Sequence, residues 1–435
     1  AWCLAVKSIF AMAILCYLVI ILLLPLQALA QSVSFPLTTR RIAVNPINVR
    51  RRMMGISQGN VRVAMKYSMA LVVSLPVGTP AQSQNLLLDT GSQLSWVHCG
   101  NKINPAQASG SSSSSPSIPS FNPAVSSSFS PLSCKDLACR PRVPDFSIPT
   151  ACGQKQQCQY SYFYADGTLA EGNLVTEKVA VSSSTILGCS VGSRDDNGLL
   201  GMNMGRLSFV SQSKIKKFSY CVPARSSGDA AAVTGSFYLG ENPNTAGIKY
   251  VNLLKFSESQ RMPNLDPLAY TVPMRGIRIG SSVLNISVSA FRPNGGGSGQ
   301  TFVDSGSELT YLVDEAYDKV KEAVVALAGG MMKRDFSYSG VADLCFDAGV
   351  APVAAQKIGG IGLEFDQGVE IAVGAEYVLT DVGNGVKCLP FGRSSMLGSA
   401  ANIIGNIHQQ NLWVEYDIAG GRIGFGAADC SKTYS

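Results

Sequence analysis

Leu86-Leu87-Leu88-Asp89-Thr90-Gly91-Ser92 is the stretch of sequence on which the fold depends, because its pattern recurs far downstream in Thr301-Phe302-Val303-Asp304-Ser305-Gly306-Ser307. In each copy a run of aliphatic or β-forming residues leads into one Asp, a hydroxyl residue, a Gly and a second hydroxyl residue. This pattern predicts a strand that ends in a tight turn carrying one carboxylate. The repeat therefore indicates two halves of similar structure, each of which supplies one acid.

The two turns predict a pair of carboxylates in one site. Gly91 and Gly306 permit a sharp backbone turn, and the small hydroxyl side chains beside them can hydrogen-bond a carboxylate or brace the opposite loop. Asp89 and Asp304 would then face each other. Two neighbouring carboxylates do not both ionise easily, so one proton is shared over a wide pH range. A water molecule held between them is a nucleophile for an amide carbonyl.

A single Asp-Thr-Gly is most often an ordinary turn, so the interpretation depends on the second copy. Each copy also has a later counterpart, Leu199-Leu200-Gly201 for the first and Ile403-Ile404-Gly405 for the second. The Gly follows its Asp by 112 residues in the first half and by 101 in the second. An aliphatic pair before Gly at similar offsets predicts a second strand packed beneath each turn.

On these motifs the chain resembles the pepsin-like aspartic proteases, in particular the plant nepenthesin-type group and its subgroup related to promotion-of-cell-survival proteases. Asp89-Thr90-Gly91-Ser92 and Asp304-Ser305-Gly306-Ser307 match the two catalytic loops, and Trp96 stands where the family usually has a Trp. Tyr164-Ala165-Asp166-Gly167-Thr168 resembles the flap motif, a hairpin tip whose Tyr closes over substrate. The similarity covers roughly residues 67 to 435.

The resemblance implies an all-β, bilobal fold, in which two lobes related by a pseudo-twofold axis flank a central cleft. The lobes would be residues 67–243, with a Cys-rich insertion at about 99–158, and residues 244–435. It also implies an endopeptidase that acts on polypeptides without a cofactor or metal. Its optimum would be acidic, because the carboxylate pair must be singly protonated, as in aspartic proteases generally.

The resemblance also assigns roles to individual residues. Asp89 and Asp304 would activate the water and move its proton. The surrounding catalytic loops would be supported by Thr90, Gly91, Ser92, Ser305, Gly306 and Ser307, with the Ser92 and Ser307 hydroxyls on the carboxylates and Thr90 and Ser305 bracing the loops. The flap and the substrate contacts would come from Tyr164, Asp166, Gly167 and Trp96.

Two positions depart from the family pattern. Ser305 stands where Thr is most frequent, which keeps the hydroxyl and loses a methyl. Ala165 replaces the usual Gly after the flap Tyr, so its Cβ would restrict the hairpin tip. Neither change removes a catalytic group.

The N-terminal segment predicts a targeting signal. An apolar run from Ile9 to Leu26 follows Lys7, and Ala28-Leu29-Ala30 has the small residues that a signal peptidase prefers, so residues 1–30 are expected to be a signal peptide. An uncleaved anchor is the alternative, because the run approaches the length of a bilayer span. Either interpretation sends the chain into the secretory pathway. The extracellular space (the apoplast) is favoured, and the vacuole and the endoplasmic reticulum stay open.

Residues 31–66 form a basic stretch, and either a propeptide or a disordered linker would explain it. As a propeptide, its positive charge would lie over the acidic cleft. Residues 1–66 hold 8 of the 35 Lys and Arg and none of the 29 Asp and Glu, so the remainder carries a net charge of −2. The net charge of +6 for the whole chain is therefore no indication of nucleic-acid or anionic-membrane binding. We expect a monomer whose membrane contact is limited to an uncleaved signal segment.

Ten cysteines remain after the signal segment, an even number that predicts disulfides in a secreted chain. They are Cys99, Cys134, Cys139, Cys152, Cys158, Cys189, Cys221, Cys345, Cys388 and Cys430. Cys345 with Cys388 is the one pairing predicted. The close spacings between Cys134 and Cys158 would also suit zinc, but the chain has only two His. The Ser-rich tract 109–117 is expected to be a mobile loop.

Three smaller features complete the sequence-based predictions. Asn285-Ile286-Ser287 is a glycosylation sequon. Residues 313–328 have the apolar spacing of a helix, which Asp314 can cap at its start. His408 is interpreted as structural.

Two rival functions stay open. A catalytically weak or inactive protein of the same fold would act as an inhibitor or a binding module, like the plant glycosidase-inhibitor proteins that resemble these proteases. A secreted Cys-rich adhesion protein would explain the cysteines but not the two Asp loops.

Overall fold

The computed structural model describes residues 32–43, 67–100, 120–140, 148–164, 169–190, 197–225, 234–257 and 262–432. The expected signal peptide, the Ser-rich tract 109–117 and the expected flap residues Asp166 and Gly167 lie outside these ranges. Within the described ranges, no helix combines the length and the apolar character that crossing a membrane requires.

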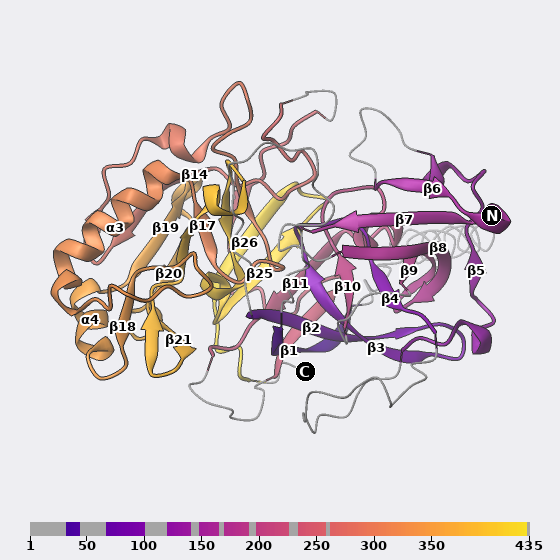
Figure 1. The fold of residues 1–435 in the computed structure, drawn as a ribbon, viewed down its shortest axis with the longest axis horizontal. Coiled ribbons are helices and arrows are strands. Elements are labelled where there is room, and N and C mark those ends of the chain that lie inside the picture. The colour runs from indigo at the N-terminus through magenta and orange to yellow at the C-terminus, as the bar shows by residue number, and fades with distance from the viewer. Residues whose placement is uncertain are drawn as a thin grey trace, which may run out of the picture.

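One large sheet dominates the N-terminal half and continues into the C-terminal half (Figure 1). Its strand order is β13-β26-β25-β11-β12-β1-β2-β3-β10-β4-β9-β8-β7-β6, and β5 pairs with β8. Its strands are β1 (Val33–Ala43), β2 (Tyr67–Val77), β3 (Gln82–Asp89), β4 (Trp96–His98), β5 (Ser130–Pro131), β6 (Thr150–Cys152), β7 (Cys158–Phe163), β8 (Leu169–Val179), β9 (Ser182–Ser190), β10 (Gly198–Gly201), β11 (Lys217–Cys221), β12 (Thr234–Leu239), β13 (Lys249–Asn252), β25 (Leu412–Asp417) and β26 (Arg422–Ala427).

Three smaller sheets, drawn mainly in orange in Figure 1, build the rest of the C-terminal half. The first is β15 (Ser282–Val283), β14 (Met274–Ile279), β19 (Ile361–Phe365) and β20 (Glu370–Val373). The second is β16 (Thr301–Val303), β24 (Asn402–Ile404), β17 (Thr310–Leu312) and β23 (Phe391–Arg393), and the third is β18 (Cys345–Asp347), β22 (Val386–Cys388) and β21 (Thr380–Gly383). The predicted bilobal, all-β fold is confirmed.

The repeat seen in the sequence is a repeat in space. β3, which ends at Asp89, runs parallel to β10, and β16, which leads to Asp304, runs parallel to β24. Each of these partner strands also meets the strand that follows the Asp loop: Leu199 of β10 pairs with Trp96, and Ile403 of β24 pairs with Tyr311. A second strand therefore does pack beside each loop, as the recurring aliphatic pairs predict.

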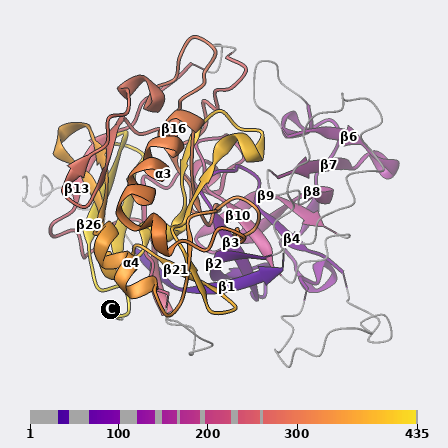
Figure 2. The same ribbon diagram turned by 60° about the vertical axis from the view of Figure 1, so that its left-hand side comes forward.

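Helices cover the outer side of the C-terminal half, where α3 (Asp314–Ala328) and α4 (Ala351–Ile358) come to the front in Figure 2. A short helix, α2 (Phe209–Gln212), lies in the N-terminal half. The helix predicted over 313–328 is confirmed, and its buried face includes Val320 and Val324. The predicted cap is wrong: the capping position is Val313, whose side chain makes no capping hydrogen bond, and Asp314 Oδ1 instead accepts the Ser395 hydroxyl at 2.7 Å.

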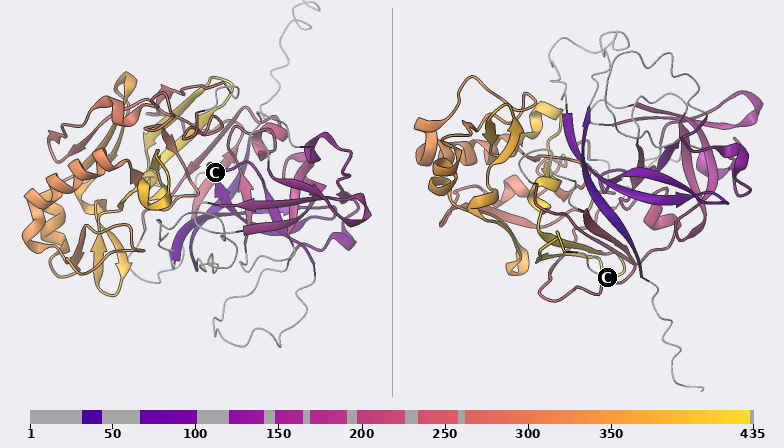
Figure 3. Two further views of the ribbon diagram at one scale, coloured as in Figure 1. Left: turned by 45° about the horizontal axis from the view of Figure 1, so that its top comes forward. Right: turned by 90° about the horizontal axis from the view of Figure 1, so that it is seen from below.

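Part of the expected propeptide or linker is a strand of the large sheet. β1 lies between β12 and β2, where Leu37 is opposite both Gly235 and Val73 and is only 1% exposed (Figure 3). Residues 33–43 are therefore built into the sheet and are not a disordered linker, and the assignment of residues 31–66 to a propeptide stays a prediction. The physical reason is that the apolar residues Val33, Phe35 and Leu37 alternate along β1, with Leu37 buried in the core and Phe35 packed against it. Residues 44–66 lie outside the described ranges.

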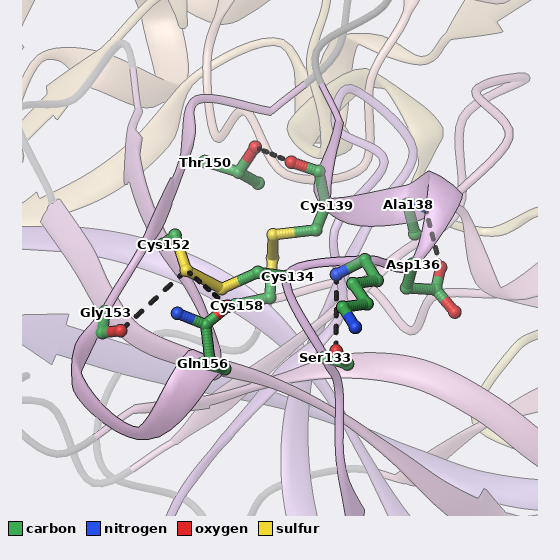
Figure 4. The surroundings of a disulfide bond; sticks show 11 residues. Ser133, Cys134, Asp136, Ala138, Cys139, Thr150, Cys152, Gly153, Gln156 and Cys158 are labelled. Carbon is green, nitrogen blue, oxygen red and sulfur yellow. Dashed lines mark hydrogen bonds between the residues drawn. A yellow bond between two sulfur atoms is a disulfide. The ribbon is translucent and has the colours of Figure 1, made fainter.

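Five disulfides pair the ten cysteines: Cys99–Cys189, Cys134–Cys152, Cys139–Cys158, Cys221–Cys430 and Cys345–Cys388. The predicted Cys345–Cys388 bond joins directly opposed positions of β18 and β22. In the Cys-rich insertion two disulfides lie close together, and the Thr150 hydroxyl donates to the Cys139 carbonyl at 2.6 Å beside them (Figure 4). These bonds hold together a segment that has few strands of its own.

Candidate active site

Each Asp loop holds its carboxylate in the same way. The Gly91 N–H donates to Asp89 Oδ1 at 2.8 Å, and the Ser92 hydroxyl donates to Asp89 Oδ2. In the second loop the Gly306 N–H donates to Asp304 Oδ1 at 2.9 Å, and the Ser307 hydroxyl donates to Asp304 Oδ2 at 2.6 Å. Both Asp residues are less than a tenth exposed. The two loops are thus near-copies down to the individual hydrogen bonds.

The glycines let the two carboxylates approach each other. A Cβ on Gly91 would stand 2.8 Å from Asp304 Oδ1, and a Cβ on Gly306 would stand 2.4 Å from Asp89 Oδ1. Contacts below 3 Å are not tolerated, so any larger residue at either position would push the opposite Asp away. Each carboxylate therefore lies directly against the backbone of the opposite loop.

A second pair of residues ties the loops together beneath the carboxylates. The Thr90 N–H donates to Ser305 Oγ at 3.0 Å, and the Ser305 N–H donates to Thr90 Oγ1 at 2.9 Å. The Ser305 hydroxyl itself donates a hydrogen bond to the Leu88 carbonyl at 2.8 Å. Thr90 and Ser305 are both fully buried, so these bonds are shielded from water. The predicted brace is present, and Ser305 serves in it without the methyl of a Thr.

Buried amides and hydroxyls, which sequence reasoning missed, form a layer below this brace. Gln409 Nε2 donates to the Asp304 carbonyl at 3.3 Å and to the Ile404 carbonyl at 2.8 Å. The Tyr220 hydroxyl donates to Gln409 Oε1 at 2.5 Å and lies 3.1 Å from the Tyr416 hydroxyl. Only tertiary folding brings β11, β25 and the segment after β24 together here.

Burial and mutual repulsion govern the protonation of the pair. Burial raises the pKa of Asp89 above its ordinary value of 3.8, and the adjacent Asp304 charge raises that pKa further. The hydrogen bonds from Ser92 and Gly91 act in the opposite direction but do not outweigh these effects. Two carboxylates this close share a proton, so the site can hold an acid and a base together.

Trp96 and Tyr164 are joined above the loops. The Trp96 Nε1–H donates to the Tyr164 hydroxyl at 2.9 Å, and the ring of Tyr164 meets that of Tyr162 edge to face with centroids 4.7 Å apart. The Asp89 charge raises the pKa of Tyr164, after the larger effect of burial. Asp166 and Gly167 fall outside the described residues.

An ion pair beside the second loop was not predicted from the sequence. Arg225 Nη1 lies 2.7 Å from Glu308 Oε1, and the two side chains are 13% and 2% exposed. Arg225 Nη2 also donates to Asn406 Oδ1 at 2.9 Å, and Asn406 Nδ2 donates to the Ser305 carbonyl at 3.1 Å. Glu308 directly follows Ser307. An acidic residue next to this Asp loop was therefore the sequence feature that could have pointed to the ion pair.

The remaining predicted positions are His408 and Asn285. His408 is buried, with Nδ1 2.6 Å from the Thr310 hydroxyl, and burial lowers its pKa to about 3. Asn285 is exposed, so its sequon is accessible. Among the described residues, no group of three or more His, Cys, Asp or Glu could hold a metal ion.

Comparison with known proteins identifies the family. Aspartic proteinase PCS1 of Arabidopsis thaliana is 35% identical over 394 residues, which cover 84% of this chain and 83% of the relative. Aspartic proteinase nepenthesin-1 of Nepenthes gracilis is 34% identical over 373 residues, which cover 83% of this chain and 78% of the relative. This chain belongs to the nepenthesin-type aspartic proteinases of plants. As a nepenthesin-type proteinase it is an aspartic-type endopeptidase that acts on peptides.

Two further comparisons bear on the fold of this nepenthesin-type proteinase. Family models described as xylanase inhibitor N-terminal and xylanase inhibitor C-terminal match residues 71–236 and 269–427. Among solved structures, that of edgp has a TM-score of 0.60 at 17% identity and covers 92% of this chain and 95% of its own. Basic 7S globulin from soybean has a TM-score of 0.59 at 14% identity, with 93% and 99% covered. Identities this low establish a common fold and nothing further.

Proposed function

We propose that Asp89 and Asp304 are the catalytic pair of this endopeptidase. The observation that carries the proposal is their reciprocal packing, in which each carboxylate lies against the glycine of the opposite loop at a separation that excludes a Cβ. Both carboxylates accept a backbone N–H and a serine hydroxyl. Their outer oxygens are thereby oriented, and the pair holds one proton because of its burial and mutual repulsion.

The proposed reaction uses the pair as base and acid in turn. The ionised carboxylate takes a proton from a water molecule held between the two Asp, and the oxygen of that water forms a bond to the peptide carbonyl carbon. The protonated carboxyl gives its proton to the carbonyl oxygen, so a neutral gem-diol forms. The amide C–N bond then breaks as the nitrogen accepts a proton from one carboxyl and the diol loses one to the other, which leaves an amine, a carboxylic acid and the pair with one proton.

The flap residues have a separate role in this proposal. Tyr164, held by the Trp96 Nε1–H, closes over the bound peptide and excludes water from the reacting atoms. Asp166 and Gly167, which lie outside the described residues, are proposed to contact the substrate. An acidic optimum follows, because a site with both carboxylates ionised holds no acid.

Cleavage of a denatured protein between about pH 3 and 6, with and without pepstatin, tests the proposal. Asp89→Asn and Asp304→Asn proteins should each lose at least about 99.9% of the activity, as expected when a proton-transfer group that acts in the reaction is removed. Asp381→Asn, which removes an equal charge at an exposed position of β21, is the matched control and should keep full activity. Unchanged cleavage by either of the first two variants would show the assignment to be wrong.

A second candidate function is inhibition or binding by a catalytically weak protein of this fold. The description of both matched family models as xylanase inhibitor favours it. The complete set of both Asp, both loop serines and Tyr164 favours the protease. Absence of peptide cleavage by the folded protein, together with tight binding to another enzyme, would decide for the second candidate.

We further propose that the chain travels through the secretory pathway with residues 1–30 as its signal, and that the protein acts as a monomer. The five disulfides support an oxidising compartment. The apoplast is the favoured destination. Glycosylation at exposed Asn285, read as a mass decrease after enzymatic deglycosylation, tests the route.

A further inference from the structure

We propose that a pocket outside the catalytic site binds a medium-chain fatty acid, whose aliphatic chain fills the pocket and whose carboxylate contacts lysine side chains at its edge. The pocket is lined by residues from both halves of the chain, and neither Asp89 nor Asp304 is among them. This inference goes beyond the proposed function and does not depend on it.

Four segments of the chain form the pocket. They are the segment after β10, α2 with the turn that joins it to β11, the segment between β13 and β14, and the turn between β25 and β26. The pocket has a volume of about 360 Å³. At ~30 Å³ for each molecule of liquid water, this space holds roughly a dozen non-hydrogen atoms, which is the size of a fatty acid with about eight to ten carbons.

The lining of the pocket is mainly apolar. Its large apolar and aromatic side chains are those of Met204, Val210, Ile215, Leu253, Tyr270 and Ile418. All six either belong to the largest hydrophobic core cluster or pack against it. An aliphatic chain in the pocket would therefore extend this core and leave water, as a core side chain does on folding.

The neutral hydroxyl groups of the lining already have partners. The Tyr270 hydroxyl donates to the Met202 carbonyl at 2.7 Å, and the Ser211 hydroxyl accepts the Ser208 hydroxyl at 2.9 Å. No Asn or Gln lines the pocket. The lining therefore offers little to a ligand with many neutral polar groups, such as a sugar, because such groups need hydrogen-bond partners when they leave water.

The charged residues of the lining are all lysines: Lys214, Lys216 and Lys255. All three are exposed, so their ammonium groups can lie at the edge of the pocket. Nζ of Lys255 lies against the backbone of Gly421, another lining residue, where an added Cβ would stand 2.9 Å from it. Ammonium groups donate hydrogen bonds and accept none. The polar end of the ligand must therefore be an acceptor, and three positive charges favour an anion.

No carboxylate of the protein neutralises these lysines within the part of the chain that the structure describes. No Asp or Glu lines the pocket, and none of the ion pairs between described residues includes Lys214, Lys216 or Lys255. The carboxylate of Asp417, next to the lining residue Ile418, accepts the Gly420 N–H and Arg422 Nε, both at 2.8 Å. The ligand carboxylate would thus bring a negative charge that the lining lacks.

Main-chain hydrogen bonds hold the walls of the pocket in place. The Lys216 carbonyl accepts the N–H groups of Ile418 at 2.9 Å and Ala419 at 3.2 Å, which joins the segment before β11 to the turn between β25 and β26. The Ile215 N–H donates to the Val210 carbonyl at 3.0 Å. The pocket is therefore formed before a ligand arrives, and binding does not have to order its walls.

Calorimetric titration of the folded protein with decanoate tests the inference. At about pH 7 the carboxylate of decanoate is ionised and Lys is protonated. Decanol has the same chain without a charge, and decylammonium has the same chain with the opposite charge.

Two variants and a control separate the lysines from the cavity. Lys214→Asn combined with Lys255→Gln removes two charges, and Asn suits position 214, where φ is 54°. Ala419→Phe fills the pocket from an exposed lining position and leaves the lysines unchanged. The control is Lys357→Gln, which removes an exposed charge on α4, away from the pocket lining.

Decanoate should bind the wild type with a Kd on the order of 10–100 μM, as expected for a ligand of this size. The double lysine variant should raise that Kd by about tenfold, because two exposed charge contacts are lost. Ala419→Phe should abolish binding, and Lys357→Gln should leave the Kd unchanged. Decanol and decylammonium should bind at least about tenfold more weakly than decanoate.

Absence of decanoate binding to the wild type at about 1 mM, or equal binding by Ala419→Phe, would overturn the assignment of the pocket. An equal affinity for decanol, or an unchanged Kd in the double lysine variant, would overturn the contact between carboxylate and lysines. Matching melting temperatures of the ligand-free variants exclude misfolding. Because binding is measured directly, failure of the protein to cleave peptides would count against the proposed function and not against this inference.

Discussion

Thr90 and Ser305 lie 215 residues apart in the sequence, and each donates its backbone N–H to the side-chain oxygen of the other. Both residues are fully buried, so the loss of either oxygen leaves an N–H without a partner or water. The two catalytic-type loops are therefore held together by groups that take no part in the proposed proton transfers.

Thr90→Val keeps the shape of the side chain and removes its hydroxyl. The free energy of unfolding should fall by about 1–3 kcal/mol, because the buried Ser305 N–H loses its acceptor. Cleavage should also weaken, since the spacing of the two Asp depends on this brace. Urea unfolding and kcat/KM measure the two effects. Thr90→Ser keeps the hydroxyl and serves as the control, and a Val variant as stable as that control would contradict the role of the bond.

Arg225→Met should be much more damaging than loss of a surface ion pair. It leaves Glu308, which is 2% exposed, as a buried charge, and the expected loss of unfolding free energy is about 3–5 kcal/mol. Lys217→Met breaks the Lys217–Glu241 pair, whose side chains are 24% and 53% exposed, and should cost at most about 1 kcal/mol.

A double variant separates the ion pair from its surroundings. Arg225→Met with Glu308→Leu removes both charges, so part of the loss seen in Arg225→Met should be recovered in urea unfolding. Because Arg225 also bonds Asn406, which holds the Ser305 carbonyl, the double variant should still cleave peptides more slowly than the wild type. If the losses of unfolding free energy caused by the two substitutions simply add in the double variant, the two side chains do not stabilise each other.

The stability of the protein should fall as the pH rises above about 4. The pKa of Asp89 is raised in the folded state, so above its ordinary value of 3.8 the folded chain binds a proton that the unfolded chain has lost. The stabilisation is complete below that value and disappears as the pH rises through the folded-state pKa. The melting temperature measured against pH shows this slope, and Asp89→Asn should flatten it. An unchanged slope in the variant would assign the dependence to other groups.

Trp96→Phe should reduce kcat/KM by about three- to tenfold. The substitution removes the Nε1–H that bonds the Tyr164 hydroxyl at 2.9 Å, and one hydrogen bond of this kind contributes about 0.5–1.5 kcal/mol. Steady-state kinetics with a peptide substrate measure the change. Trp413→Phe, which alters a ring packed on Tyr238 in a separate core cluster, is the control and should leave kcat/KM unchanged. An equal kcat/KM for the two variants would show that the Trp96–Tyr164 hydrogen bond has no part in closure over the substrate.

Local motifs explain what could be predicted about the site. Asp, a hydroxyl residue and Gly in sequence specify a turn with one carboxylate wherever they occur, and two copies predict a pair. The helix over residues 313–328 could likewise be predicted, because the spacing of apolar residues is a local property of the sequence. The predicted cap at Asp314 was wrong because two groups from elsewhere in the fold compete for that side chain, the Ser395 hydroxyl by a hydrogen bond and the Arg393 guanidinium at 3.7 Å.

Residues that act through distant partners escaped the sequence analysis. Gln409, Tyr220 and Arg225 carry no local pattern, and each matters only because of the strand that folding brings beside it. The same holds for β1, whose place between β2 and β12 depends on pairing with residues some 200 positions away. Of the cysteine pairings, one of five was predicted, because spacing alone does not distinguish the possible partners.

By itself the sequence determined the two Asp loops, the strand beneath each of them, the all-β class and the family resemblance, since these depend on neighbouring residues and on one internal repeat. Only the tertiary structure decided which cysteines pair, that residues 33–43 join the sheet, and that Arg225 meets Glu308. The physical reason is that burial and charge environment are sums over atoms from the whole fold, and no short stretch of sequence contains them.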